Sequence, residues 1–257
     1  MLGKLLKYEI KATARIFLPL YVVLLVFAAI HKLITVLSPS TVIQAPEVIS
    51  MIAYIMIVVA VFVVTFVVMI QRFYKNLLSD EGYLMFTLPT KPWKHIVCKL
   101  LISMIWSVVS AIAAVISVLI IAGDKIFAAV SMDKLLSAFA EVFKHLDLSS
   151  TLFTIEFLVG CVIGLAGSVL IIYASVALGH LFNKHRVLAS LGAYIMLTTV
   201  TQIIFAIASA IAFTFDLHPQ GFLIHLFIWL GILFFGLISA AYFVITNYIL
   251  SRHLNLE

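Results

Sequence analysis

The chain has 257 residues, of which 65% are hydrophobic and only 11% are charged. This composition excludes a soluble globular domain and a disordered chain, and it is typical of an integral membrane protein. The formal net charge of +5 follows from membrane topology, as argued below, and does not indicate nucleic-acid binding. We expect a single transmembrane domain over residues 1–257.

Six apolar stretches are each long enough, with their flanks, to cross a bilayer. A helix needs about 20 apolar residues to span roughly 30 Å of hydrocarbon, and backbone groups in lipid must be satisfied within their own segment. We therefore expect an all-α integral membrane protein. Its predicted spans are 16–37, 48–71, 96–122, 152–179, 187–214 and 222–250.

The basic residues predict the orientation of these spans. Of the 16 Lys and Arg residues, 12 fall on the side that holds both termini. They are Lys4, Lys7, Lys11, Arg15, Arg72, Lys75, Lys91, Lys94, Lys99, Lys184, Arg186 and Arg252. Because loops rich in Lys and Arg stay in the cytoplasm, both termini are predicted to be cytoplasmic.

The first 15 residues predict an amphipathic helix that lies on the inner membrane surface. At about 100° per residue, the four basic side chains of this segment share one narrow stripe. Glu9 lies on the opposite, apolar face and needs a polar neighbour there. The segment either anchors the entry to the first span or also meets a cytoplasmic partner. Pro19 is tolerated if it lies in the first turn of the span.

The cytoplasmic loop 72–95 is too patterned for a simple turn. Phe73, Leu77 and Leu78 predict a short amphipathic helix, which Gly82 ends. An apolar face beside acidic residues favours docking into a partner, and packing back onto the membrane is the alternative.

The outer loop 123–150 carries an apolar stripe of its own, which predicts an amphipathic extracellular helix. Such a helix would rest on the outer leaflet or act as a lid over an exit for substrate.

Three stretches together resemble a known family. The runs FYKNLLSDEGYLMFTLPTKPW, LLKYEIKATARIFLPLY and ALGHLFNKHRVLAS are similar to the membrane subunits of ABC-2 type ATP-binding-cassette transporters of Gram-positive bacteria. The likeness is greatest to permeases that export phenol-soluble modulins, which are amphipathic peptide toxins. The resemblance implies a multi-pass protein of the bacterial cytoplasmic membrane that pairs with a second permease, identical or not.

In that family the loop between the second and third spans holds a coupling helix that contacts a separate cytoplasmic ATPase. Position by position, this implicates Lys75, Asn76, Leu77, Leu78, Ser79, Asp80, Glu81, Gly82 and Tyr83. A smaller second contact would involve Asn183, Lys184 and His185. The implied substrates are hydrophobic or amphipathic peptides or drugs, and membrane lipid is a further partner.

The chain lacks the motifs of an enzyme. There is no GxxxxGK[ST], HExxH or GxSxG sequence, so no cofactor or metal is expected in this chain, and ATP and Mg²⁺ would be bound by the partner ATPase. The two cysteines, Cys98 and Cys161, are predicted at different depths, which argues against a disulfide.

Two groups of polar residues lie inside predicted spans. The fifth span carries a polar stripe that either packs internally or lines a pathway or dimer seam. Its members are Tyr194, Thr198, Thr201, Gln202 and Ser209. Glu156 in the fourth span either reaches interfacial water or pairs with a polar residue at similar depth, for which His225 is the candidate.

The sequence thus predicts the membrane subunit of an ATP-driven exporter. The alternatives are a secondary carrier or channel without an ATPase, and a non-transporting membrane anchor or immunity protein. Against the carrier, the spans hold no central carboxylates and no evident inverted repeat.

Overall fold

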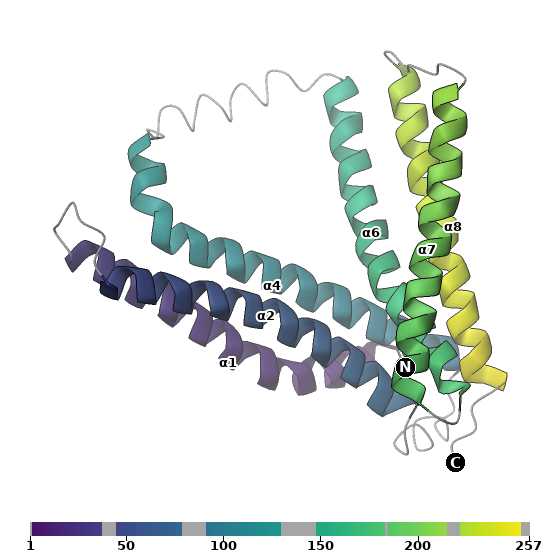
Figure 1. Ribbon diagram of the computed structural model, residues 1–257, viewed down its shortest axis with the longest axis horizontal. Helices are drawn as coiled ribbons and strands as arrows, with labels where there is room; N and C mark the ends of the chain where they lie inside the picture. Colours follow the sequence, from purple (N-terminus) through teal and green to yellow (C-terminus); the bar gives the residue numbers. More distant parts are fainter. Residues whose placement is uncertain are drawn as a thin grey trace. The chain divides into compact units, whose positions relative to one another are not determined.

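A computed structural model describes residues 2–37, 45–78, 91–129, 148–182, 185–214 and 222–252. Six helices in these ranges are long and apolar enough to cross a membrane (Figure 1). They are α1 (Leu2–Leu37), α2 (Ala45–Leu77), α4 (Pro92–Ala129), α6 (Leu148–His180), α7 (Arg186–Thr214) and α8 (Phe222–Arg252). The predicted all-α fold with six spans is confirmed. Most of the predicted extracellular segment 123–150 and half of the loop 72–95, residues 79–90, lie outside the described residues.

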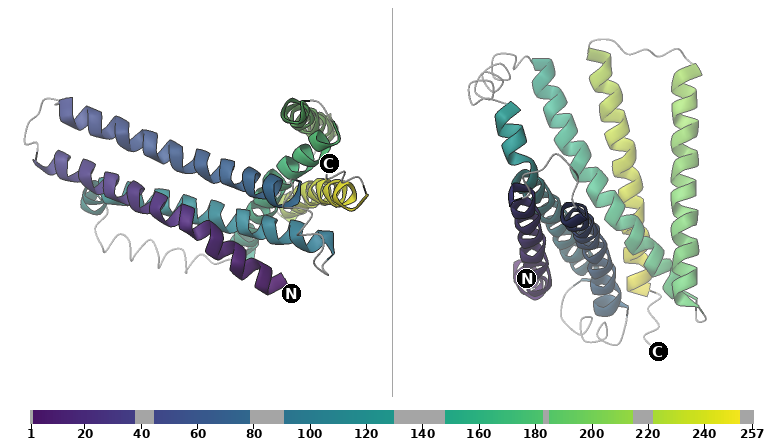
Figure 2. Two further views of the ribbon diagram at one scale, coloured as in Figure 1. Left: turned by 90° about the horizontal axis from the view of Figure 1, so that it is seen from below. Right: turned by 60° about the vertical axis from the view of Figure 1, so that its left-hand side comes forward.

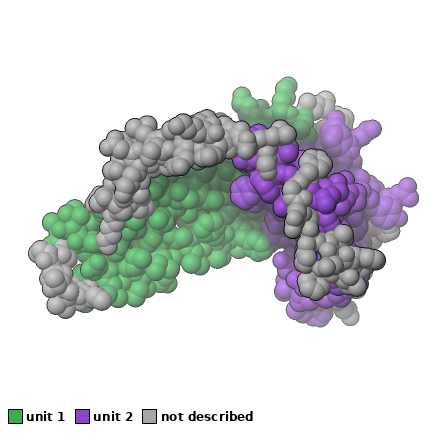
Figure 3. All heavy atoms as spheres, turned by 90° about the horizontal axis from the view of Figure 1, so that it is seen from above, with its two compact units in different colours: residues 1–69, 101–144 green, residues 70–100, 145–257 purple. Residues whose placement is uncertain are grey.

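The chain divides into two compact units, coloured in Figure 3. Unit 1 contains residues 1–69 and 101–144, and unit 2 contains residues 70–100 and 145–257. The helices α2 and α4 each contribute to both units, because the boundaries at 69 and 101 fall within them. Each unit has its own packing, described separately below.

In unit 1, α1, α2 and α4 run side by side (Figure 2), and a chain of hydroxyl groups joins all three. Thr65 of α2 donates to the backbone carbonyl of Val61 at 2.7 Å, so its 2.9 Å contact with Ser110 of α4 uses the Ser110 proton. Tyr21 of α1 must then donate to Ser110, at 2.8 Å. Each hydroxyl can donate only one proton, so the three side chains form a chain of hydrogen bonds that runs from Tyr21 through Ser110 to Thr65. This chain is called the relay below.

A second bond of the same kind lies further along the helices. Ser117 of α4 donates to its own helix at the carbonyl of Ala114, so Tyr54 of α2 donates to Ser117 at 2.8 Å. Because a hydroxyl in lipid has no water to bond, these contacts hold the three helices in one register.

The predicted break between an amphipathic segment and the first span is not observed, because α1 is continuous from Leu2 to Leu37. Residues before and after residue 16 pack against α4, and this packing stabilises one continuous helix across the predicted break. Thr13 accepts a hydrogen bond from Trp106 at 2.8 Å, and the ring of Phe17 stacks on Trp106 at 4.6 Å. Pro19 consequently lies inside the helix and not in its first turn. The four basic side chains of the segment are exposed, as predicted.

Replacing Ser110 with Ala should destabilise the protein, because the Tyr21 hydroxyl loses its acceptor and Thr65 loses its donor. Each interhelical bond in a membrane protein contributes about 0.6 kcal/mol on average, so a loss of about 1 to 2 kcal/mol is expected. The midpoint of thermal unfolding in detergent micelles would measure it. The matched control is Ser168→Ala, since Ser168 is exposed and bonds only within its own helix. Equal midpoints for the two variants would contradict the relay.

Candidate functional site

The segment predicted to contact an ATPase begins at residue 75, next to the buried core of unit 2. The rings of Phe73, near the end of α2, and Tyr173 of α6 stack at 4.0 Å between centroids with an interplanar angle of 8°. Both side chains are almost completely buried, which for residues of this size stabilises a core by about 1.5 to 3 kcal/mol each. The whole core consists of Phe73, Leu77, Leu78, Ile96, Val169, Leu170, Tyr173, Ala174, Tyr242 and Leu250.

This core holds both flanks of residues 79–90. On one side Leu78 is 2% exposed, and on the other Ile96 is fully covered. Both pack into the cluster that α6 and α8 supply. Because packed interiors deform little, a displacement of either flank is passed to these two spans.

Three of the residues that were predicted to contact the ATPase are buried. Asn76 is 8% exposed, and Leu77 and Leu78 are almost completely covered. The predicted apolar face of Phe73, Leu77 and Leu78 packs against the core of unit 2. Lys75 is exposed, and Ser79 to Tyr83 lie outside the described residues.

Of the second predicted contact, only His185 is described, while residues 183–184 are not. His185 is exposed and has a φ of 63°, a left-handed conformation typical of a tight turn. Its carbonyl accepts a bond from Ala189 N at 3.0 Å, so it begins α7. The preceding helix end approaches closely, since a Cβ on Gly179 would lie 2.5 Å from the backbone of Ser190.

His180, at the end of α6, is a polar residue that the site prediction did not include. It is 9% exposed, and its Nδ1 has no hydrogen-bond partner in the described part of the chain. The ring of Tyr74 meets it edge-on at 6.2 Å. A buried nitrogen without a partner is costly, and it lies at the same end of unit 2 as the segment discussed above.

The residues of the polar stripe on α7 differ in the partners that they contact. Thr201 forms a hydrogen bond with the Tyr242 hydroxyl of α8, so this part of the stripe packs internally. Thr198 and Ser209 donate to carbonyls of their own helix, at 2.7 and 2.9 Å. Tyr194 is exposed.

Gln202 differs from these residues. Its side chain is exposed, and among the described residues it has no hydrogen-bond partner. None of the residues in the most apolar 18-residue window of α7 is buried. An amide in lipid needs a partner or water, so this face of α7 requires something that the described residues do not provide.

Glu156 of α6 and His225 of α8 form a buried pair. The Nδ1 atom of His225 lies 2.9 and 3.0 Å from the two carboxylate oxygens of Glu156. The side chains are 1% and 6% exposed, and the ring of Phe153 covers His225 at 4.4 Å. The partner suggested for Glu156 from the sequence is thus the residue that contacts it, and Glu156 does not reach interfacial water.

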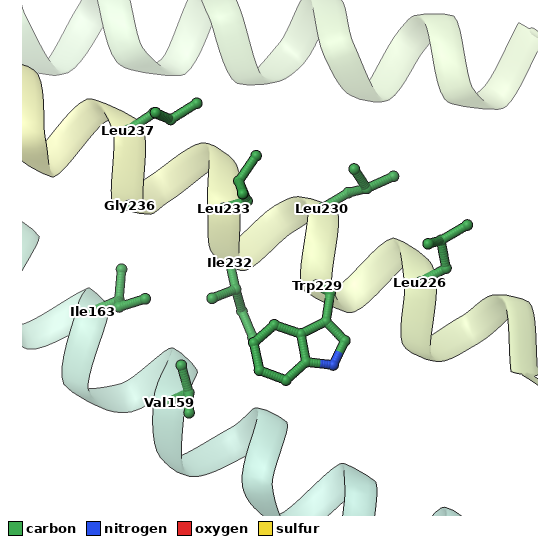
Figure 4. Close-up of a pocket in the computed structure, with 9 residues that line it drawn as sticks. All are labelled: Val159, Ile163, Leu226, Trp229, Leu230, Ile232, Leu233, Gly236 and Leu237. Atoms are coloured by element: carbon green, nitrogen blue, oxygen red, sulfur yellow. The ribbon is translucent and has the colours of Figure 1, made fainter.

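An apolar groove starts next to this pair. Val159 follows Glu156 by about one turn, and Leu226 follows His225 directly. In Figure 4, Val159 and Ile163 of α6 face Trp229 of α8. The groove has a volume of about 460 Å³ and is lined by Val159, Ile163, Leu226, Trp229, Leu230, Ile232, Leu233, Gly236 and Leu237. Such a lining can hold an apolar chain or side chain, and the indole N–H of Trp229 is its one polar side-chain group.

The two cysteines lie on different helices. Cys98 of α4 is buried and Cys161 of α6 is exposed, and the two are not joined by a disulfide bond. Within the described ranges, no three His, Cys, Asp or Glu side chains gather in a way that could hold a metal ion.

In comparisons with family models, curated proteins and solved structures, nothing matches the chain. The ABC-2 likeness therefore depends on the sequence runs quoted above, and the function is argued below from those runs and from the geometry of the two units.

A double-mutant cycle on Glu156 and His225 should show strong coupling. Glu156→Leu or His225→Leu alone leaves one buried polar group without its partner, which costs about 3 to 5 kcal/mol, whereas the double variant removes both groups and is close to neutral. The midpoint of unfolding in detergent is the measurement. Thr154→Val is the control, because Thr154 is exposed and bonds only within α6. Additive effects of the two single variants would contradict a coupled pair.

Proposed function

We propose that the chain is the membrane subunit of an ATP-driven exporter of the ABC-2 type. In this proposal it pairs with a second permease subunit and binds a separate ATPase on its cytoplasmic side. It performs no chemistry of its own and moves hydrophobic or amphipathic peptides or drugs outward.

One observation carries this proposal. The segment that resembles a coupling helix is held at both ends in the core of unit 2, through Leu78 and Ile96. A loop that served only to connect two spans would not need two anchors buried among α6 and α8. With this geometry, a displacement of either flank moves packed spans.

The surface left to an ATPase includes polar groups. Lys75 is exposed beside this core. Asp80 and Glu81 of the same segment add acidic groups. Charged contacts across an interface determine how a partner is oriented more than how tightly it binds.

Two features support a translocation pathway. Gln202 presents an amide on the exposed face of α7, which suits either a wet pathway or the seam with a second permease. The apolar groove between α6 and α8 suits the apolar face of an amphipathic substrate.

The Glu156–His225 pair favours a second candidate function. Buried ionisable pairs in spans are used by proton-coupled carriers, and this pair is almost completely removed from solvent. A carrier would need no ATPase, so the energy source separates the two candidates.

Purification of the tagged full-length chain from its native membrane is the direct test. The exporter proposal predicts that an ATPase subunit co-purifies and that its ATP hydrolysis in liposomes is stimulated by amphipathic peptide. An ATPase that binds without stimulation would favour a membrane anchor, and the absence of any ATPase would favour a carrier.

Phe73→Leu should weaken coupling between ATP hydrolysis and transport. The change keeps an apolar side chain in the core but removes the ring stack on Tyr173, so the flank is held less firmly. We expect the ATPase to remain bound while peptide-stimulated hydrolysis falls roughly tenfold, which corresponds to about 1.4 kcal/mol of lost coupling. Phe66→Leu on the exposed side of the same helix is the control. Wild-type stimulation in Phe73→Leu would contradict a mechanical role for this core.

Replacing Asp80 and Glu81 together with Ala should release the ATPase or uncouple its hydrolysis from transport. The reason is the loss of the acidic contacts that the resemblance assigns to the coupling segment. Retention of the ATPase on the immobilised chain, measured beside membrane insertion, reports the effect. Unchanged retention and unchanged transport would count against docking at this loop.

A further inference from the structure

A cavity in unit 1 combines an apolar wall with charged groups. It has a volume of about 570 Å³ and lies where α1 ends and α2 begins, beside a late turn of α4. Its lining is His31, Lys32, Thr35, Val36, Glu47, Val48, Met51, Ile52, Ile121 and Ala122. The sequence predicts this end of the helices on the outer side of the membrane.

The proton positions at the cavity follow from its hydrogen bonds. Ser50 donates its one proton to the backbone carbonyl of Glu47 at 2.9 Å. The contact of 2.8 Å between Ser50 Oγ and His31 Nδ1 therefore uses a proton on Nδ1. In the neutral imidazole the other nitrogen, Nε2, then carries a lone pair and is an acceptor.

Two acceptors in this lining lack a donor. His31 is 6% exposed, and its ring lies parallel to that of Tyr54 at an interplanar angle of 13°. Among the described residues, Nε2 of His31 has no hydrogen-bond partner, and neither does the half-buried carboxylate of Glu47. Both acceptors line the cavity and are therefore available to a hydrogen-bond donor on a bound molecule.

The cavity also has a cation and a lipid-facing side. The ammonium of Lys32 reaches the carbonyl of Ile121 at 3.5 Å, so the cation is held at the cavity. Val48 and Ile52 of α2 are both in the lining and exposed on the helix surface. A molecule that enters from the bilayer would thus meet apolar side chains and charged groups together.

We propose that this cavity binds the head group of a phospholipid that carries a primary ammonium, of the phosphatidylethanolamine class. The lipid ammonium donates to His31 Nε2 and to the Glu47 carboxylate, and its phosphate pairs with Lys32. An acyl chain lies along Val48 and Ile52. The two acceptors bind hydrogen-bond donors, and a primary ammonium has such donors whereas a quaternary choline ammonium lacks them.

The site is independent of the proposed transport function. It lies within unit 1, whereas the ATPase contact is assigned to unit 2. Lipid binding and ATPase binding can therefore fail or succeed separately.

The test is lipid retention by the full-length chain. Protein is reconstituted in vesicles of phosphatidylethanolamine, phosphatidylcholine and phosphatidylglycerol in equal parts, extracted gently, and analysed by native mass spectrometry. Since hydrogen bonds to charged groups change affinity by roughly tenfold or more, phosphatidylethanolamine should be retained about tenfold over phosphatidylcholine.

Variants locate the site. Glu47→Gln, which keeps the size of a half-buried side chain, and His31→Phe should each remove the preference between these two lipids. Thr154→Val in unit 2 should leave it intact. Glu47→Gln tests the site even if His31→Phe does not fold, because Ser50 loses its donor only in the latter.

Three outcomes would overturn the proposal. Equal retention of the ethanolamine and choline lipids would remove the need for N–H donors, and stronger retention of phosphatidylglycerol would indicate an anion site. A preference that persists in Glu47→Gln would place the lipid elsewhere on the chain.

Discussion

The fold depends on one constraint, which is that a polar group within a bilayer must find its hydrogen-bond partner inside the protein. Unit 1 meets it with the relay from Tyr21 through Ser110 to Thr65. Unit 2 meets it with the pair of Glu156 and His225. In a soluble protein, water would compete for these hydrogen bonds. In lipid there is no such competitor, so the hydrogen bonds determine which faces of the long apolar helices pack together. Where the constraint is not met by the described residues, as at Gln202, the chain points to a partner or a ligand.

The end of unit 2 that the sequence predicts to be cytoplasmic is stabilised differently. Its cluster around Phe73 and Tyr173 is mostly apolar and buried, so burial supplies most of its stability. Tyr242 of the same cluster also forms a hydrogen bond with Thr201. This cluster joins the flanks of residues 79–90 to α6 and α8, which gives the loop a firm mechanical connection. The same cluster explains why a short apolar face in a loop between two spans need not be a docking surface.

Much of this was readable from the sequence, and the exceptions have physical causes. Span positions follow from hydropathy, because lipid imposes a minimum apolar length on every helix. The partner of Glu156 was found because a buried carboxylate needs one and few polar residues lie at its depth. Periodicity identified the apolar face of Leu77 but could not tell whether the chain's own core or a partner covers it. The relay at Ser110 was missed because single hydroxyls in apolar helices resemble packing residues until three helices are brought together.

The account makes this chain a passive pathway whose energy comes from nucleotide bound elsewhere. The most direct measurement is transport of a labelled amphipathic peptide in liposomes, with and without the ATPase, after ionophores have collapsed every ion gradient. The account predicts movement of peptide that requires both ATP and the ATPase and that persists in ionophores. Transport by the purified chain alone, driven by a proton gradient and indifferent to nucleotide, would contradict it.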